Sequence, residues 1–201
     1  MSKGLLSDTP TDIQPYELEN AELLSTGRLI RATATIEYII TLYLCKMADI
    51  AEGQSVVLMG RMPASARLKL VETFAVIKGQ AYVDLHNECF NNEYYIGLVR
   101  LRNTAVHGFL MGKAERGLIA FAVQEHAGMD ENKIYETVRT YAPESFEQAA
   151  LVAEGVIPQL IDRLELRPLL DKRRAQALDP HPKGRRQTAK KKAKRESQHL
   201  A

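Results

Sequence analysis

The sequence has no tryptophan and only two cysteines, Cys45 and Cys89. A small secreted domain held together by disulfides normally carries more cysteines, so we expect both thiols to be reduced. The N-terminus has neither the basic start nor the apolar core of a signal peptide. The most apolar stretch, residues 36–45, contains Glu37 and is too short to span a bilayer. These absences favour a cytoplasmic protein that makes no membrane contact.

Several motifs that carry chemistry are also absent. The sequence contains no G-x-x-x-x-G-K-[ST], G-x-G-x-x-G, G-x-S-x-G or H-E-x-x-H pattern. Nucleotide hydrolysis by a P-loop, dinucleotide redox chemistry, serine hydrolysis and zinc proteolysis therefore lose their support. His86 and Cys89 lie among acidic residues, but a metal site needs three or four converging ligands. The sequence offers no second cluster of such residues that could complete the site. We expect neither a metal nor a cofactor.

Charge is distributed unevenly along the 201 residues. Residues 172–201 hold eleven basic and two acidic side chains, a net charge of +9. The preceding 171 residues hold 16 basic and 23 acidic side chains, a net charge of −7. A mildly acidic body is thus followed by a strongly basic tail, and the tail has no apolar periodicity. We expect this tail to be disordered.

Hydrophobic periodicity predicts a mainly α fold, a bundle of about four helices with a small β-hairpin before the last helix. The expected helices cover residues 16–51, 65–79, a stretch from 83 or 92 to 107, and 144–166, and the expected strands cover 117–125 and 133–142. Pro158 lies inside the last helical pattern, so a kink or a split is expected there.

Three segments follow from this pattern. Residues 1–15 form an N-terminal extension, residues 16–171 a helical domain, and residues 172–201 the basic disordered tail. Helical bundles place their binding sites in clefts between helices or across a dimer interface.

One short stretch concentrates the residue types that handle phosphate. Residues 100–108 read RLRNTAVHG. Asn103 and His107 are four residues apart and Arg100 is seven from His107, so these three share one helical face. Arg102 is five residues from His107, which places it about 140° round the helix. Gly108 is positioned to end the helix.

These side chains suit metal-independent cleavage of RNA. The reaction needs a group that moves a proton near neutral pH, a role for which histidine is suited. It also needs donors aimed at the charge that develops on the phosphate, which the fixed fork of arginine supplies. An amide such as Asn103 can orient the imidazole or the phosphate.

The stretch resembles the R-x4-6-H motif of the HEPN family (higher eukaryotes and prokaryotes nucleotide-binding domains). In that family the arginine is typically followed by a polar residue, here Asn103, and the motif lies near the end of a late helix in a short bundle. The resemblance covers residues 16–166, but only the nine residues of the motif are specific.

The resemblance implies a metal-independent endoribonuclease of a toxin or antiviral type, with two motifs facing one cleft in a homodimer. By the same resemblance, Arg102 contacts the phosphate, His107 takes part in proton transfer and Asn103 supports them. Arg100 fits the longer spacing and is the second candidate for the phosphate contact. The implied partners are RNA, a second copy of the chain and an antitoxin protein.

Two other interpretations stay open. The stretch also fits an ordinary solvated helix end, since a histidine near a helix C-terminus is favoured by the helix dipole alone. The HEPN family also contains members without activity, so a non-catalytic module that binds RNA or a protein is the alternative function.

The basic tail can hold RNA or DNA by neutralising phosphates, or it can simply be a solubilising terminus. It contains no aromatic side chain for base stacking, so binding through it would be non-specific and sensitive to salt. The residues expected to contact nucleic acid are Arg185, Arg186, Lys190, Lys191, Lys192, Lys194 and Arg195.

Deletion of residues 172–201 tests the tail. We expect weaker binding of a mixed-sequence single-stranded RNA, measured by fluorescence anisotropy over a series of KCl concentrations. Each phosphate neutralised on a single strand contributes about −0.7 to the slope of log Kobs against log salt, so losing seven contacts would flatten the slope by up to about 5. An unchanged slope would assign the tail to solubility.

Overall fold

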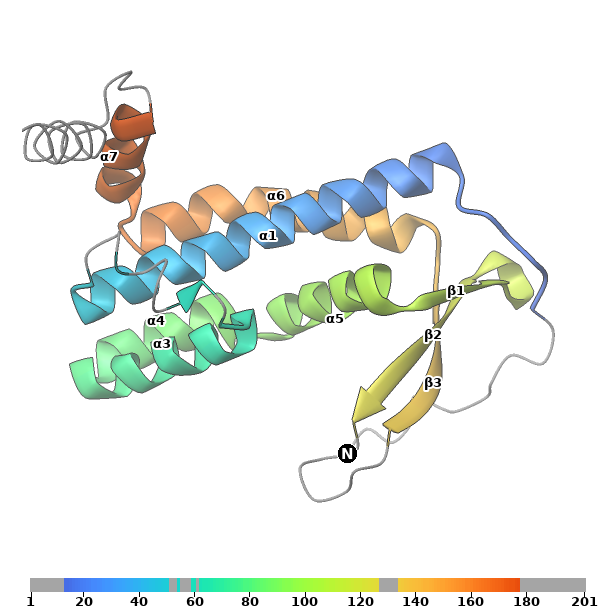
Figure 1. Cartoon of the computed structure of the whole chain (residues 1–201), viewed down its shortest axis with the longest axis horizontal. Coiled ribbons are helices and arrows are strands. Elements are labelled where there is room, and N and C mark those ends of the chain that lie inside the picture. Colours follow the sequence, from blue (N-terminus) through green and yellow to red (C-terminus); the bar gives the residue numbers. More distant parts are fainter. Residues whose placement is uncertain (1–12, 51–53, 55–58, 61, 127–133, 178–201) are drawn as a thin grey trace, which may run out of the picture. The chain divides into compact units, whose positions relative to one another are not determined.

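The computed structural model describes residues 13–50, 54, 59–60, 62–126 and 134–177. Within this part of the chain it contains six α-helices and one three-stranded antiparallel sheet (Figure 1). The mainly α class is therefore confirmed, although the helices number six rather than about four. The chain divides into two compact units, Met1–Leu160 and Ile161–Ala201.

The helix α1, Asn20–Ala48, forms the centre of the larger unit. Leu29, Ile36 and Ile40 form an apolar stripe along it at helical spacing, and each is at most 2% exposed. Further apolar side chains on its other faces are buried too, so the helix is enclosed on several sides. A capping box begins it, in which the Glu22 carboxylate accepts from the Glu19 N–H at 2.7 Å.

Three shorter helices follow: α3, Ala64–Lys78; α4, Gln80–Phe90; and α5, Glu93–His107. Both α3 and α5 pack against α1 (Figure 1). Gly79 joins α3 to α4 at a φ of 108°, a conformation that side chains disfavour. Asn92 begins α5 by accepting a hydrogen bond from the Tyr95 N–H at 2.9 Å. Of the two starts expected for the helix that ends at residue 107, the one at residue 92 agrees with α5, and the residues from 80 to 90 form the separate helix α4.

The expected hairpin is confirmed and extended by one strand. The strands are β1, Phe109–Lys113; β2, Ile119–His126; and β3, Ile134–Tyr141; they pair in the order β1-β2-β3. Ile119 pairs with Tyr141, and the turn predicted between β2 and β3 lies outside the described residues. Gln14 bridges to Lys113 on β1 through two backbone hydrogen bonds of 2.9 and 2.8 Å.

The last two helices are α6, Glu144–Arg163, and α7, Arg167–Ala177. The helix α6 runs through Pro158 without the split that the sequence suggested. Residues 172–177, which we expected to be disordered, are helical in α7. The reason is local, since α7 is rich in Leu, Lys, Arg, Ala and Gln, which favour helix even without an apolar stripe. The basic residues at 185–195 lie outside the described residues.

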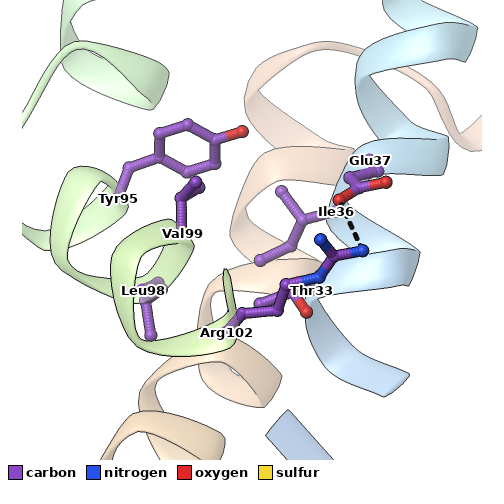
Figure 2. A pocket seen from close by; sticks show the side chains of 7 residues that line it. All are labelled: Thr33, Ile36, Glu37, Tyr95, Leu98, Val99 and Arg102. Carbon is purple, nitrogen blue, oxygen red and sulfur yellow. Dashed lines mark ion pairs between the residues drawn. The ribbon is translucent and has the colours of Figure 1, made fainter. Parts of the chain in front are cut away.

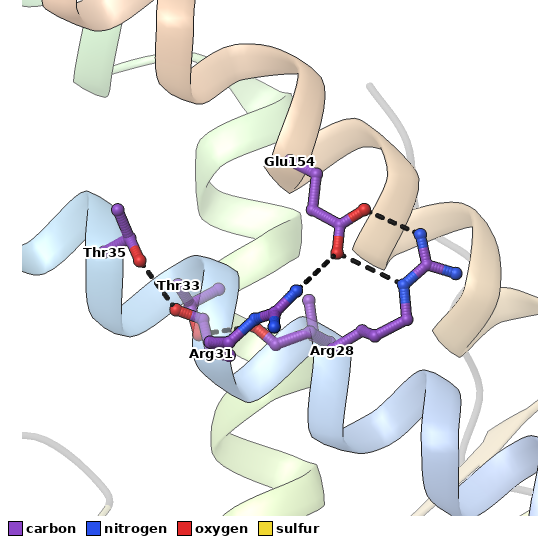
Figure 3. A network of polar contacts seen from close by, with 6 residues as sticks. Arg28, Arg31, Thr33, Thr35 and Glu154 are labelled. Atoms are coloured by element: carbon purple, nitrogen blue, oxygen red, sulfur yellow. Dashed lines mark hydrogen bonds and ion pairs between the residues drawn. The ribbon is translucent and has the colours of Figure 1, made fainter.

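One carboxylate ties α6 to α1 within the larger unit. Glu154 accepts from Arg28 Nη2 at 2.6 Å, and its other oxygen lies 3.6 Å from Arg31 Nη2 (Figure 3). The hydrogen bond from Arg28 is the main reason why the pKa of Glu154 lies below its ordinary value. In the described part of the chain, no helix is both long and apolar enough to cross a membrane.

An aromatic cluster joins the sheet to α6. The ring centroids of Phe121, Tyr141 and Phe146 lie 5.9–6.3 Å apart in three tilted or edge-on pairs, a favourable geometry. Phe121 and Phe146 are almost completely buried. The sheet is therefore anchored to the helices at the end nearest Gly108.

Substitution of Gly112 by alanine tests the junction between the N-terminal segment and β1. Gly112 has a φ of 148°, and an added Cβ would collide with the carbonyl oxygen of Gln14. We expect Gly112→Ala to lower the free energy of unfolding by about 1–3 kcal/mol, measured by urea denaturation.

Gly155→Ala is the matched control. Gly155 lies on the exposed side of α6 and has open space around the position of a Cβ. Alanine there should stabilise the protein by about 1 kcal/mol or less. Equal effects of the two substitutions would contradict the close approach at Gly112.

Candidate functional site

The helix α5 carries the motif and has one buried face and one exposed face. Leu98, Leu101 and Thr104 are buried. On the other side, Arg100, Asn103 and His107 are all exposed and follow one another at spacings of three and four residues. These three residues form the polar stripe of α5, as the helical spacing predicted.

The position of His107 is set by the glycine that follows it. The Gly108 N–H donates to the Thr104 carbonyl at 2.8 Å and closes the last turn of α5. A Cβ on Gly108 would lie 2.5 Å from that carbonyl oxygen and 3.4 Å from the Phe121 side chain. Glycine therefore allows the chain to pass directly from α5 into β1, which places His107 at the junction of helix and sheet.

Thr104 links the middle of the motif to β3. Its hydroxyl oxygen lies 3.1 Å from the Tyr141 hydroxyl, and Arg139 Nη1 donates to it at 3.4 Å. The Thr104 hydroxyl also donates to the Arg100 carbonyl at 3.1 Å. The strand β3 thereby brings another guanidinium group, that of Arg139, to the helix α5 that carries the motif.

An open groove of about 500 Å³ runs beside the polar stripe. Its polar lining comes from four elements or their ends: Asn91, Arg100, Asn103, Gln124 and Arg139. Tyr95, Ile96 and Val99 provide apolar walls. A groove of this size that combines apolar walls with guanidinium and amide groups can accept a flat, anionic molecule.

Arg102 lies on a different side of α5, facing α1. Its Nη2 is 3.5 Å from Glu37 Oε1, and the side chain is only 25% exposed (Figure 2). Its Nη1 also donates to Asn103 Oδ1 at 3.0 Å. Arg102 therefore connects α1 to the polar stripe through Asn103.

Glu37 also forms an ion pair with a second arginine, Arg67. Arg67 Nη2 on α3 lies 3.9 Å from Glu37 Oε2, and Arg67 Nη1 donates to the Thr41 hydroxyl at 2.6 Å. One carboxylate is thus shared by two guanidinium groups, Arg67 and Arg102. A cavity of about 20 Å³ beside Glu37 and Arg102 is large enough for one water molecule (Figure 2).

Tyr95 borders both the groove and this small cavity. Burial, and then the negative charge of Glu37, raise the pKa of Tyr95 to about 12. Its phenol is therefore uncharged at neutral pH and forms part of the wall rather than acting as a base. The neighbouring Tyr94 points to solvent and is 78% exposed.

The predicted site residues are thus only partly brought together. Arg100 and Asn103 share the groove, and Asn103 contacts Arg102, but Arg102 is paired with Glu37. His107 is exposed and has no hydrogen bond or ion pair with any described residue. Sequence reasoning missed Arg139 and Glu37, because both reach α5 only through tertiary packing.

The comparisons with known proteins add no further assignment. The chain matches no family model, no curated protein and no solved structure. Among the residues that the structure describes, no group of three or more His, Cys, Asp or Glu side chains could hold a metal ion.

Removal of the shared carboxylate tests the Arg67–Glu37–Arg102 cluster. Glu37→Ala leaves two partly buried guanidinium groups without their anion, so we expect the free energy of unfolding to fall by about 1–3 kcal/mol in urea denaturation. Glu72→Gln is the control, because the Lys69–Glu72 pair is exposed and such pairs contribute about 1 kcal/mol or less. Equal losses would mean that the shared carboxylate has no special structural role.

Proposed function

We propose that the chain is a metal-independent endoribonuclease of the HEPN type. The observation that carries this proposal is the polar stripe of α5, in which Arg100, Asn103 and His107 are exposed along one face and the first two line a groove. A cation, an amide and an imidazole at these spacings supply the functional groups that phosphate cleavage requires.

The proposed reaction uses the RNA's own 2′-hydroxyl as nucleophile. The bond from the 2′-oxygen to phosphorus forms and the bond from phosphorus to the 5′-oxygen breaks, which leaves a 2′,3′-cyclic phosphate and a 5′-hydroxyl. One group must take the proton of the 2′-hydroxyl and another must give a proton to the 5′-oxygen. Each chain offers one exposed histidine on the stripe, so a homodimer with two His107 residues would supply both groups.

The contacts of the two arginines favour different roles. Arg100 lines the groove and is exposed, so it is the arginine we assign to the phosphate. Arg102 is held by Glu37 and donates to Asn103, so we assign it to positioning the amide. Direct contact between Arg102 and a phosphate would require it to leave Glu37.

A second function is favoured by one observation. His107 lines neither the groove nor the small cavity, whereas Arg100, Asn103 and Arg139 border the groove. That arrangement suits a non-catalytic HEPN-like module that binds RNA through the groove. The two proposals differ in whether His107 matters.

The test is RNA cleavage in EDTA by the purified wild-type protein and by His107→Ala. We expect wild type to produce 2′,3′-cyclic phosphate ends from a mixed single-stranded RNA pool. Because a general acid or base contributes roughly 10²- to 10⁴-fold, His107→Ala should reduce the rate by at least about 100-fold. Arg100→Gln should reduce it more than Arg102→Gln.

Lys78→Ala is the control, since it removes a positive charge at the end of α3 and outside the groove. Its cleavage rate should equal that of wild type. Intact RNA with every protein, together with RNA binding that Arg100→Gln weakens and His107→Ala does not, would replace the ribonuclease with the binding module.

A further inference from the structure

A second cavity opens beside the groove, between α3 and α4. It has a volume of about 230 Å³. Leu68, Phe90 and Asn91 line both this cavity and the groove that contains Arg100, so the two lie next to each other. A ligand that lies in the groove can therefore extend into this cavity.

His86 of α4 is one of the residues that line the cavity. His86 is only 6% exposed, and its Nδ1 has no hydrogen-bond partner among the described residues. Leaving such an atom unsatisfied costs about 1–3 kcal/mol, so a ligand that reaches it gains a hydrogen bond that the protein alone does not make. Burial lowers the pKa of His86, since it disfavours the charged imidazolium.

The rim of the cavity supplies one anion and one cation. Lys69 Nζ donates to Glu72 Oε2 at 2.6 Å, and both side chains border the cavity. The side chain of Asn91 adds an amide, and Leu68 and Phe90 add apolar surface. Such a set of groups complements a planar heterocycle whose edge carries both hydrogen-bond donors and acceptors.

We propose that this cavity binds a guanine base of single-stranded RNA whose phosphate lies at Arg100. Guanine presents neighbouring N–H donors that match the Glu72 carboxylate, and O6 and N7 acceptors that match Lys69. Adenine carries a single amino donor, and the smaller pyrimidines fill less of the volume. The inference rests on the proposed ribonuclease and gives it a preference for the base beside the cut.

The first experiment measures binding without cleavage. Isothermal titration calorimetry compares GMP, AMP, CMP and UMP on the full-length protein. We expect GMP to bind at least about tenfold more tightly than UMP. Glu72→Gln and His86→Phe should each reduce GMP affinity to that of UMP, while Lys78→Ala should leave it unchanged.

Two variants guard against a fold defect. His86→Phe keeps an aromatic ring against Phe90, whose centroid lies 5.9 Å from that of His86. Glu72→Gln alters a residue on the surface, so thermal unfolding should match that of wild type. Four nucleotides that bind within threefold of one another, or no binding by any of them, would overturn the guanine pocket.

The second experiment separates this inference from the proposed function. Sequencing of the ends produced from a mixed RNA pool should show guanine enriched at one position next to the cut, and Glu72→Gln should abolish that enrichment. Cleavage without a guanine preference would overturn the guanine pocket but support the proposed ribonuclease. Selective GMP binding without cleavage would support the guanine pocket but overturn the proposed ribonuclease.

Discussion

The burial of α1 is the constraint on which the larger unit depends. Three of its apolar side chains, Leu29, Ile36 and Ile40, are almost fully removed from water, and each such burial contributes about 1.5–3 kcal/mol. The helices α3 and α5 pack against α1, and Glu154 of α6 accepts from an arginine on it. The orientation of α5, and hence of the polar stripe, follows from which of its faces must cover α1.

Packing of α5 against α1 also explains why the two arginines of the motif differ. A helix that buries Leu98 and Leu101 brings Arg102 toward the same neighbour, where Glu37 neutralises it. Arg100 projects to the exposed side and stays beside the groove. Arg102 therefore makes a structural contact, whereas Arg100 lies on the exposed surface. The two side chains point in different directions because each residue turns the helix by 100°.

The sequence predicted what periodicity controls and missed what packing controls. The long helix α1, the β2–β3 hairpin and the shared face of Arg100, Asn103 and His107 all follow from local spacing, and all are present. The strand β1 was missed because five residues that include Gly112 carry no alternation and pair only through β2. Contacts such as Arg102–Glu37 join residues far apart in the chain, so no local pattern could reveal them. The orphaned atom of His86 is likewise visible only once α3 and α4 are packed.

The order of the strands decides which edges of the sheet could pair with another copy of the chain. One outer edge of the sheet, on β1, is partly occupied by the bridge to Gln14. The other edge, on β3, pairs with no further strand among the described residues. Exposed strand edges invite pairing with a neighbouring molecule, and charged side chains on them discourage it. Glu136 and Arg139 lie on β3, so the strand that lends a guanidinium to the groove also carries the charges that oppose edge-to-edge aggregation.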